Sequence, residues 1–393
     1  MIRASFEEAG FETVPFGAPC DICVIHGCVV TARAEEDSTR LVRSIKRRCP
    51  NAFVVLAGCA AELRKDGKTD ADLLANQADK FNLPALLAPD RSQKEIPAQN
   101  VMTPRFSTKR AIVKIQDGCD FRCSYCIVPG VRGKSRSRPG TEIIEEITRL
   151  TLCGFPEIVL TGVNIGCYDQ DGLRLAQLLE KVEAIPGLKR FRISSLEPAT
   201  AEREVIDFMA SSKKMCSHLH LPLQNGSNRI LQAMGRRYTA EKYCATVEYA
   251  RSRLGLFGLG TDLIVGFPGE TNDDFMENER LIKQLPFTQL HVFGYSPRPG
   301  TPAALMDAAV PKKEKEKRVA RLIELGLEKR KTFAQAFIGK QPCFVVEKAT
   351  NGWAEGWTGE YLRARVRSND LKPRQIVSFL CERVEDDVLL GKI

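Results

Sequence analysis

Short apolar runs alternate with amphipathic segments along most of this 393-residue chain. Near the N-terminus the 3.6-residue period predicts helices at 2–11 and 38–49, and apolar runs predict strands at 20–28 and 52–59. A polar stretch without periodicity then predicts a linker. We therefore expect an α/β domain over residues 1–90 and a linker over 91–109.

The middle of the chain repeats a strand-helix unit. Parallel strands with right-handed helical crossovers curl into a barrel, and six strands are too few for the complete eight-stranded form. The pattern predicts an open, partial (βα)6 barrel over residues 110–334, with a basic helical segment at 311–331. The expected strands are 111–117, 157–162, 190–195, 218–223, 261–267 and 289–295, and the expected helices are 142–152, 175–185, 202–212, 240–254 and 272–285.

From residue 335 onward short strand patterns occur without helices between them, at 343–349, 360–368, 376–384 and 387–393. They predict a small antiparallel β-barrel over residues 335–393, of a kind that often binds nucleic acid. The fold class expected for the whole chain is α/β.

Composition favours a soluble globular protein, with 43% hydrophobic and 27% charged residues. The first twelve residues lack the apolar core of a signal peptide, and no uncharged apolar run approaches the roughly 20 residues of a membrane span. We expect a cytoplasmic protein that does not associate with membranes. In that reducing compartment its 14 cysteines are suited to metal binding or chemistry rather than disulfides.

The net charge of +9 is concentrated in two places. Arg132, Lys134, Arg136 and Arg138 follow a cysteine-rich loop, and the second basic run is the helical segment 311–331. A polyanion such as RNA would explain both runs, and a solvated surface would explain the second.

Cys119, Cys123 and Cys126 form a C-x3-C-x2-C triplet directly after the first strand of the predicted barrel. A structural zinc normally has four protein ligands, and no further Cys or His lies close behind Cys126. Three thiolates on a four-iron cluster would leave one iron open to a substrate or cofactor. Because chemistry in βα barrels lies at the carboxyl ends of the strands, this position favours redox catalysis. Zinc completed by a distant ligand is the alternative.

The segments "IQDGCDFRCSYCIVPGVRGKSRSRP", "LTGVNIGCY", "ISSLEP", "HLHLPLQNGS", "TDLIVGFPGE" and "FGYSPRPGTPA" resemble the methylthiotransferases of the radical S-adenosylmethionine superfamily. Within that family, "TGVNIG" and "SSLEP" are most similar to the branch that acts on N6-threonylcarbamoyladenosine at position 37, next to the tRNA anticodon. The isopentenyladenosine-tRNA branch and the ribosomal-protein branch carry other versions of these loops.

The resemblance implies a [4Fe–4S] cluster on Cys119, Cys123 and Cys126 whose fourth iron is chelated by S-adenosylmethionine. It implies a deoxyadenosyl radical that takes hydrogen from the adenine C2, followed by insertion of sulfur and transfer of a methyl group. The implied cofactor-binding residues are Thr161, Gly162, Asn164, Ser195, Glu197 and Gln224. Asn225 and Asn228 stand where the family usually has Ser and Asp, which puts the orientation of this loop in question.

Cys28 and Cys59 end neighbouring predicted strands and would face one crevice. Alone, such a pair is more often part of a buried core. The resemblance instead matches "GCVVT" and "AGCAA" to two ligand motifs of the family's auxiliary [4Fe–4S] cluster. The family's third ligand lies upstream of a helix that resembles 2–12, so we expect that the sequence is truncated and the auxiliary site incomplete. Cys20 and Cys23 are nearby, but neither is expected to replace that ligand.

His218 and His220 alternate with leucines, and we expect packing or hydrogen bonding inside the barrel rather than metal ligation. Near the C-terminus, Arg363, Arg365 and Arg367 share one face of a strand, as RNA phosphate contacts require. Trp353, Trp357 and Tyr361 either stack on bases or fill the core of the small barrel. With Arg132, Arg136 and Arg138, these arginines are the predicted RNA-binding residues; the small barrel resembles the TRAM-like barrel of the family.

We therefore expect a tRNA methylthiotransferase that uses two [4Fe–4S] clusters and S-adenosylmethionine. Its expected partners are tRNA and an electron donor such as flavodoxin or ferredoxin, and the protein is expected to be a monomer. The other hypotheses are the ribosomal-protein or isopentenyladenosine branch, a radical enzyme without sulfur insertion, and a non-catalytic zinc protein that binds RNA.

Overall fold

The computed structural model describes residues 2–64, 67–88 and 109–393. Among these, the chain forms two compact units. The first comprises the N-terminal part up to residue 88 together with segments 125–133 and 296–305, and the second comprises the rest. The predicted linker 91–109 lies outside the described residues except for its last position. The predicted division into three domains stays a prediction.

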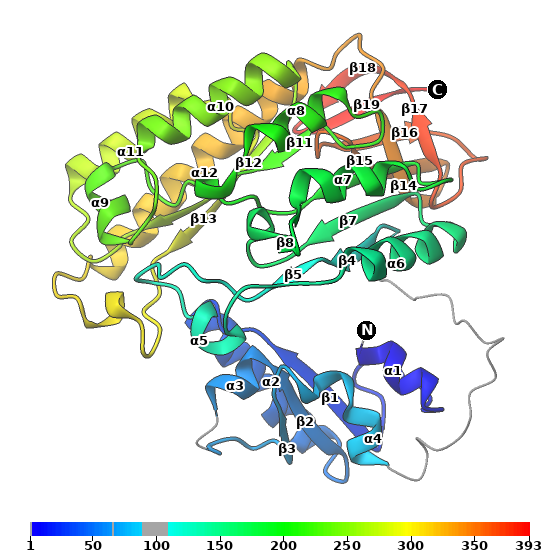
Figure 1. The fold of residues 1–393 in the computed structure, drawn as a ribbon, viewed down its shortest axis with the longest axis vertical. Coiled ribbons are helices and arrows are strands. Elements are labelled where there is room, and N and C mark those ends of the chain that lie inside the picture. The colour runs from blue at the N-terminus through cyan, green and yellow to red at the C-terminus, as the bar shows by residue number, and fades with distance from the viewer. Residues whose placement is uncertain (1, 65–66, 89–108) are drawn as a thin grey trace. The chain divides into compact units, whose positions relative to one another are not determined.

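The first unit contains a parallel sheet of three strands in the order β1-β2-β3 (Figure 1). The apolar residues of α1 and α4 pack on one face of this sheet, around Val55 and Ala57. Residues of α2, α3 and the short helix α5 pack on the other face, around Val54 and Leu56. The bounds are β1 Ile22–Gly27, β2 Phe53–Gly58, β3 Leu73–Ala75, α1 Ile2–Glu8, α2 Ala32–Arg48, α3 Cys59–Leu63, α4 Leu83–Leu87 and α5 Val128–Arg132.

The predicted strands and helices of this unit are confirmed, but α2 begins six residues earlier than predicted. Its N-cap is Thr31, whose hydroxyl accepts a hydrogen bond from the Ala34 N–H at 3.2 Å. This cap satisfies one of the free amides of the first turn, so the polar residues that follow it can be helical.

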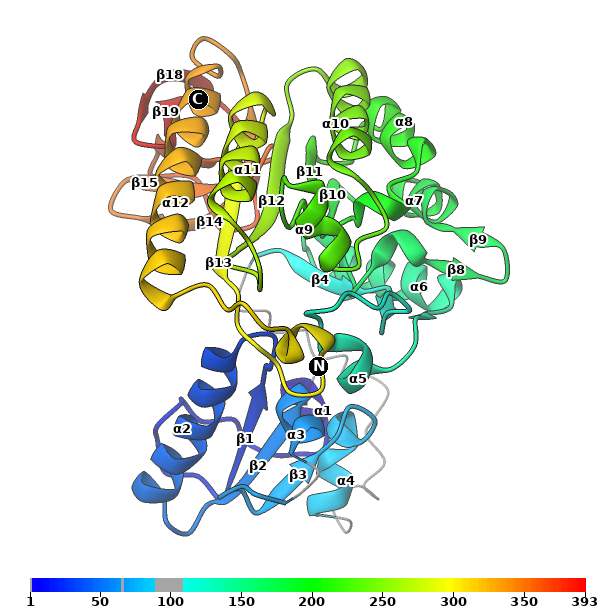
Figure 2. The same ribbon diagram turned by 90° about the vertical axis from the view of Figure 1, so that its left-hand side faces the viewer.

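In the second unit, six parallel strands follow one another in the order of the sequence. Backbone hydrogen bonds join β4-β7-β10 and β11-β12-β13, and the bridges Phe191–Met215 and Ser195–His220 connect the two halves. The helices lie on the outside of this curved sheet (Figure 2), as a partial (βα)6 barrel requires. The strands are β4 Ala111–Lys114, β7 Glu157–Thr161, β10 Arg190–Ile193, β11 His218–His220, β12 Gly258–Val265 and β13 Gln289–Gly294.

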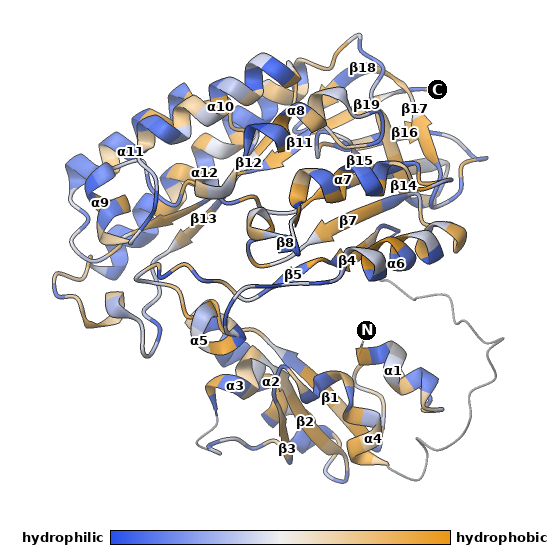
Figure 3. Ribbon diagram, in the orientation of Figure 1, coloured by the Kyte–Doolittle hydropathy of each residue, from blue (hydrophilic) through white to orange (hydrophobic). Residues whose placement is uncertain are grey.

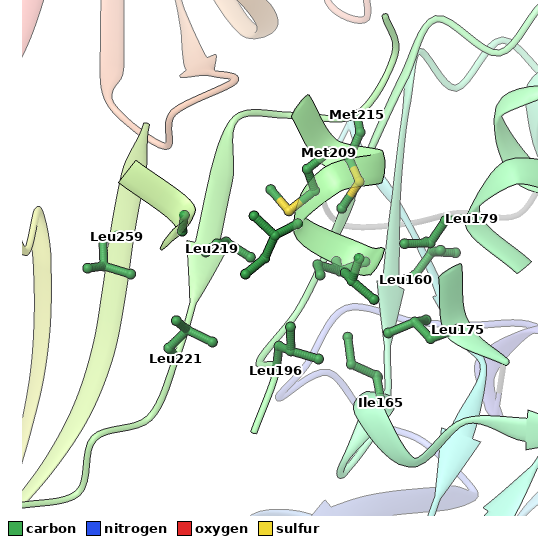
Figure 4. Packing of buried hydrophobic residues seen from close by; sticks show 14 of the residues in the cluster. Leu160, Ile165, Leu175, Leu179, Leu196, Met209, Met215, Leu219, Leu221 and Leu259 are labelled. Atoms are coloured by element: carbon green, nitrogen blue, oxygen red, sulfur yellow. The ribbon is translucent and has the colours of Figure 1, made fainter. Parts of the chain in front are cut away.

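Apolar side chains between strands and helices form the main core of this unit. Strand β7 is largely apolar, whereas α10 and α11 mix polar and apolar positions (Figure 3). Leu160 and Leu219 come from strands and meet residues such as Met209 from a helix (Figure 4). The helices are α6 Gly140–Leu152, α7 Leu175–Glu183, α8 Arg203–Ser211, α9 Asn228–Ala233, α10 Ala240–Leu254, α11 Asn272–Gln284 and α12 Lys312–Gln335.

The sequence did not predict α9 or the two short hairpins of this unit. Gln116–Asp117 (β5) pairs with Arg136–Ser137 (β6), and Asp169–Gln170 (β8) pairs with Leu173–Arg174 (β9). The basic segment near residue 320 is part of α12, where Leu322 and Leu325 are buried in the barrel core. Arg318 of this helix is also buried and pairs with Glu270 at 2.7 Å, so part of its charge serves the fold.

The C-terminal strands form a curled six-stranded sheet in the order β17-β14-β15-β16-β19-β18. One of its pairs, β16–β19, is parallel, so the sheet is not purely antiparallel as predicted. Strand β15 was missed because its outward positions alternate with Ala, Gly and Thr, which give a weak apolar signal. The bounds are β14 Cys343–Thr350, β15 Trp353–Thr358, β16 Arg363–Arg367, β17 Ile376–Ser378, β18 Leu380–Glu385 and β19 Val388–Lys392.

A buried ion-pair cluster joins this sheet to the amino ends of the barrel strands. Glu157, at the start of β7, is fully buried and pairs with Arg190 and Arg192, 2.6 Å away in the case of Arg192. These guanidinium groups also donate to the carbonyls of Trp357 at 2.7 Å and Thr358 at 3.1 Å. The sheet is therefore attached at the end of the barrel opposite to the loops with the predicted chemistry.

Among the residues described, no helix has both the length and the apolarity needed to cross a membrane.

Candidate active site

The cysteine loop begins directly after β5, and a buried glutamine connects it to the next loop of the barrel. The side-chain amide of Gln116 donates to the carbonyl of Gly118 at 2.8 Å, and its oxygen accepts from the backbone amides of Val163 and Asn164 at 3.0 and 2.9 Å. A Cβ on Gly162 would lie 2.9 Å from this glutamine, so the close approach of the two loops requires glycine there. Gln116 thus fixes the "TGVN" loop beside Cys119.

Two hydrogen bonds are directed at the sulfur of Cys119. The Phe121 backbone amide lies 3.4 Å from it, and the side chain of Asn164 donates to it as well. Burial nevertheless raises the pKa of the free thiol, and these two donors partly offset that effect. Donors of this kind also stabilise sulfur ligands of a metal cluster. The predicted residue Asn164 is therefore at the cysteine loop, where its oxygen also accepts from Thr200 at 3.2 Å.

Cys123 is buried and lies beside the guanidinium group of Arg236, with its sulfur 3.2 Å from Nη1. The same guanidinium pairs with the carboxylate of Glu197, which the sequence predicted as a cofactor-binding residue, and donates to Tyr238 at 3.2 Å. Burial raises the pKa of Glu197, and the Arg236 charge counteracts part of this rise. Arg236 therefore connects the cysteine loop to the "SSLEP" loop after β10.

The segment after α9 holds the other side of the cysteine loop. The amide of Ser124 donates to the carbonyl of Met234 at 2.9 Å, and its hydroxyl donates to Ala233 at 2.8 Å. A Cβ on Gly235 would lie 3.2 Å from the carbonyl of Arg122. The backbone around Cys123 is thus fixed by the protein itself. Cys126 follows in segment 125–133, which belongs to the first unit.

The remaining predicted cofactor residues lie at carboxyl ends of the barrel strands. Thr161 ends β7, and Ser195 forms a bridge with His220 next to β10. The buried hydroxyl of the adjacent Ser194 has no partner among the described residues, so a bound ligand could satisfy it. Gln224 has a left-handed φ of 65° and pairs through its backbone with Asp262 and Ile264 of β12.

The question about the orientation of the "QNGS" loop has a structural answer. Asn225 is fully buried and donates to Glu270 of the "VGFPGE" turn at 2.8 Å, and its oxygen accepts from the Ser227 amide at 2.9 Å. Asn228 is exposed and accepts from the amide of Ala240 at 2.7 Å. Both asparagines are thus hydrogen bonded within the fold, and Asn225 connects the "QNGS" loop to the "VGFPGE" turn.

The sequence assigned no role to Cys167, Gln116 or Arg236. Burial, with Cys119 and the carboxylates of Asp120 and Glu197 nearby, raises the pKa of Cys167 to about 11. This thiol is therefore near the site but protonated at neutral pH. A polar Gln116 inside an apolar strand next to the cysteines was a usable signal, whereas the segment around Arg236 had no periodicity to indicate burial.

The sulfur positions in the barrel unit can be compared with those of a zinc site. Four thiolates on one zinc, at about 2.3 Å each, would have sulfurs about 3.8 Å apart. In the described part of this unit Cys119, Cys123 and Cys167 are not all within 4.8 Å of one another. These three thiols therefore do not form a preformed tetrahedral zinc site.

In the first unit, Cys59 is buried at the start of α3 and accepts two hydrogen bonds. The donors are Gln77 Nε2 at 3.2 Å and Arg132 Nε at 3.3 Å. Arg132, which the sequence predicted to bind RNA, is thus placed against a predicted cluster ligand. Cys28, at the end of β1, is exposed. Cys20 and Cys23 are half-buried, and burial raises the pKa of each.

The predicted RNA-binding arginines differ in their surroundings. Arg136 is exposed, whereas Arg138 pairs with Glu146 at 2.7 Å and donates to the Lys114 carbonyl. On β16 the three arginines share the outer face of the sheet, as predicted; Arg365 pairs with Glu355, and Arg363 and Arg367 are exposed.

Trp353, Trp357 and Tyr361 lie outside the apolar core of the small sheet. Trp353 is on the same outer face as the arginines, with Arg365 4.2 Å and Arg367 5.1 Å from its ring centroid. Tyr361 packs under Arg192 at the junction with the barrel and stacks on His218 at 4.9 Å. The expectation that His218 packs inside the barrel is confirmed.

Two family models match the chain. The Radical SAM superfamily matches residues 113–282, and the uncharacterized protein family UPF0004 matches residues 1–77. These matches cover most of the barrel, including Cys119, Cys123 and Cys126, and the N-terminal part with Cys28 and Cys59.

Curated relatives are similar over most of the chain. The threonylcarbamoyladenosine tRNA methylthiotransferase MtaB of Bacillus subtilis is 34% identical over 91% of this chain and 84% of its own length, and that of Thermotoga maritima is 32% identical over 97% and 93%. The tRNA-2-methylthio-N(6)-dimethylallyladenosine synthase of Carboxydothermus hydrogenoformans is 36% identical over 82% and 79%.

Among solved structures, the radical S-adenosylmethionine methyltransferase TsrM of Kitasatospora setae shares the fold. Its TM-score is 0.55 at 16% identity, over 77% of this chain and 67% of that chain. At this identity the likeness concerns the fold alone.

Proposed function

This chain belongs to the tRNA methylthiotransferase family and is a transferase, and from that premise we propose that it converts N6-threonylcarbamoyladenosine at tRNA position 37 to its 2-methylthio derivative. The observation that carries the proposal is the set of hydrogen-bond donors around the sulfurs of Cys119 and Cys123. Hydrogen-bond donors from two other segments, Asn164 and Arg236, and the Phe121 amide of the cysteine loop itself are directed at these sulfurs. The non-catalytic zinc hypothesis and the ribosomal-protein branch are not retained.

Soft thiolate ligands with N–H donors around them fit a [4Fe–4S] cluster on Cys119, Cys123 and Cys126. The chemistry that such a cluster supplies when bound is one-electron reductive cleavage of S-adenosylmethionine. Asn164, Glu197 and Ser195 lie at the strand ends beside this loop, where they would bind and orient the cofactor. Because a radical reacts with whatever it reaches, the rigid surroundings of the loop matter for excluding water and side reactions.

The auxiliary cluster is proposed on Cys28 and Cys59. Cys59 meets the demands of a cluster ligand, because it is buried and accepts from Gln77 and Arg132. The proposal extends to tRNA and a flavodoxin or ferredoxin as partners, to a monomeric state and to the cytoplasm. The proposed small RNA-binding barrel is the TRAM-like sheet of residues 335–393.

The choice between the threonylcarbamoyl and dimethylallyl substrates is supported by charge. A threonylcarbamoyl group carries a carboxylate, and a dimethylallyl group is an apolar hydrocarbon. Next to Arg236, the guanidinium of Arg237 is stacked over the ring of Phe121 at 4.3 Å and is within electrostatic reach of Cys167. Stacking orders this guanidinium beside the cysteine loop, where it is suited to bind a carboxylate.

This proposal is tested by giving the reconstituted protein the two tRNA substrates in competition and measuring the methylthio nucleosides by mass spectrometry. We expect a preference for the threonylcarbamoyl substrate, which Arg237→Leu lowers roughly tenfold, the size of one charge-assisted hydrogen bond, and which Arg237→Lys largely retains. Arg363→Ala, on the outer sheet face, is the matched control, because it should weaken both substrates equally. A preference for the dimethylallyl substrate in the unaltered protein would contradict the proposal.

The outer face of β16 supports a proposed role in phosphate binding. Because this sheet is attached at the amino ends of the barrel, its arginines are separated from the active site by at least the length of a five-residue strand, roughly 17 Å. We expect whole tRNA to bind better than a short anticodon hairpin. In the double variant Arg363→Ala, Arg367→Ala, the slope of log affinity against log salt concentration should become shallower. The change should be about one for each phosphate that the variant no longer binds.

A further inference from the structure

Two histidines and an aspartate meet on three neighbouring strands of the barrel. His220 ends β11, Asp262 lies within β12 and His291 lies within β13. One oxygen of Asp262 is 3.2 Å from His220 Nε2 and 3.1 Å from His291 Nδ1. In the part of the chain that the structure describes, this is the one group of at least three His, Cys, Asp or Glu ligand atoms that lie within 4.8 Å of one another.

A glycine inside strand β12 provides the space that the His220 ring occupies. A Cβ on Gly260 of β12 would lie 2.7 Å from His220 Nδ1, so only glycine allows the imidazole to occupy its position. Glycine inside a strand is unfavourable and often marks a site where another group approaches closely. Gly258 makes room for His218 in the same way, but His218 stacks on Tyr361. Packing therefore accounts for the position of His218. The ring of His220 instead faces the ring of His291 at 5.3 Å.

Contrary to the expectation from the sequence that His220 is not a metal ligand, we propose that His220, Asp262 and His291 bind a divalent transition metal of the zinc and iron(II) class. Metal–ligand distances of about 2.0–2.2 Å place the ligand atoms of a tetrahedral site about 3.3 Å apart, and two of the three separations are already close to that value. Two imidazoles and one carboxylate are a ligand set that these metals use, with at least one coordination position left for water or substrate.

The surroundings of the three residues fit this role. One oxygen of Asp262 already faces a ring nitrogen of each histidine, so the three side chains are directed toward one another. The side-chain amide of Gln289 lies 2.9 Å from His291 Nε2. With its oxygen turned toward that nitrogen, Gln289 would accept the Nε2–H and leave Nδ1 free for the metal, as second-shell groups commonly do. His291 is half-exposed, which gives a metal ion access.

The test uses an untagged chain in which Cys28, Cys59, Cys119, Cys123 and Cys126 are all replaced by alanine, so that iron–sulfur clusters do not contribute. Zinc and iron(II) are offered separately and together under anaerobic conditions, and bound metal is measured by elemental analysis. We expect about one metal ion per chain, retained by His218→Phe and lost in His291→Ala and Asp262→Asn.

Cobalt(II) provides a second measurement that does not depend on stability. The visible spectrum of four-coordinate cobalt should appear with the parent chain and disappear with His291→Ala. Because His291 is half-exposed, this substitution should leave the fold intact, and circular dichroism checks that the variant is folded. Binding of iron(II) in preference to zinc would identify the metal within the proposed class. Substoichiometric metal, or a full equivalent that His291→Ala retains, would overturn the proposal. Neither result bears on the radical chemistry, because the five cysteines are absent.

Discussion

Cys123 in the barrel unit and Cys59 in the N-terminal unit both accept a hydrogen bond from a guanidinium group, yet the two arginines are held differently. Arg236 is nearly fully buried and pairs with Glu197, so its position is fixed by a neighbouring loop of the same barrel. Arg132 ends a helix of five residues, α5, and is half-buried. The partners of the cysteines differ as well, since Cys119 is hydrogen bonded in the barrel and Cys28 is exposed.

In the barrel, the protein therefore holds both Cys119 and Cys123 in place before any cluster binds. In the N-terminal unit it holds Cys59 but not Cys28. A preorganised site holds its cluster tightly and keeps reacting groups in place. A partly organised site is expected to exchange its cluster or the sulfur of that cluster more readily, which suits a sulfur donor. The following variants test that contrast.

The largest effect is expected for Arg236→Leu. The variant leaves the buried Glu197 carboxylate without its partner and removes a donor from Cys123, so the free energy of unfolding should fall by about 3–5 kcal/mol. Urea denaturation of the cluster-free protein measures this. Arg237→Leu, one position along, is the control and should change stability by less than about 0.5 kcal/mol. Equal effects of the two variants would mean that Arg236 does not organise the site.

A smaller effect is expected for Gln116→Leu, which keeps the volume of the side chain but removes the acceptor of the Val163 and Asn164 amides. Leaving these buried groups without a partner should cost about 1–3 kcal/mol. Because the "TGVN" loop is then no longer fixed beside Cys119, the KM for S-adenosylmethionine should rise as well. Gln232→Leu on the exposed face of α9 is the control, and an unchanged KM in Gln116→Leu would contradict the role given to this residue.

At the N-terminal site, Arg132→Leu should cost about 1 kcal/mol, because Gln77 still donates to Cys59. The informative readout is the rate at which a chelator removes iron from the reconstituted protein. We expect two phases, of which only the faster one, assigned to the N-terminal cluster, accelerates further in the variant. Arg136→Leu provides the comparison. Acceleration of the slower phase would show that Arg132 acts on the barrel cluster instead.

The smallest effect concerns pH. Burial raises the pKa of Glu197 in the folded protein above its usual value near 4.5, so between these two values the folded state binds more protons than the unfolded state. Stability is therefore lost as the pH rises through this window and stays constant above the folded pKa. Measured against Glu197→Gln, the unfolding free energy of the unaltered protein should decline from a pH of about 4.5 upward; an increase would mean that Arg236 outweighs burial.

Much of the fold could be predicted because its strands are short apolar runs between amphipathic helices, and all six barrel strands were found in this way. The loops that carry Cys119, Asn164 and Glu197 were located because they follow those strands. Thr31, which starts α2 early, and the weak pattern of β15 were missed because a cap and an alternation of aromatic with small residues give little apolar signal.

What could not be predicted are the contacts between loops far apart in the sequence. Arg132 and Arg138 look alike in a basic run, yet one lies against Cys59 and the other pairs with Glu146. Periodicity indicates which face of an element is buried, but it carries no information about which distant charged group a buried arginine meets. The meeting of His220, Asp262 and His291 likewise depends on the register of β11, β12 and β13.

The most direct test of the central claim is the iron, sulfide and zinc content of the anaerobically reconstituted protein, compared with that of Cys123→Ala. If the barrel loop holds a four-iron cluster, the variant loses about four irons and four sulfides per chain and no longer cleaves S-adenosylmethionine. Cys244→Ala on α10 should lose none. An unaltered protein that binds zinc in place of iron at the cysteine loop, or a Cys123→Ala variant with its full iron content, would contradict the account.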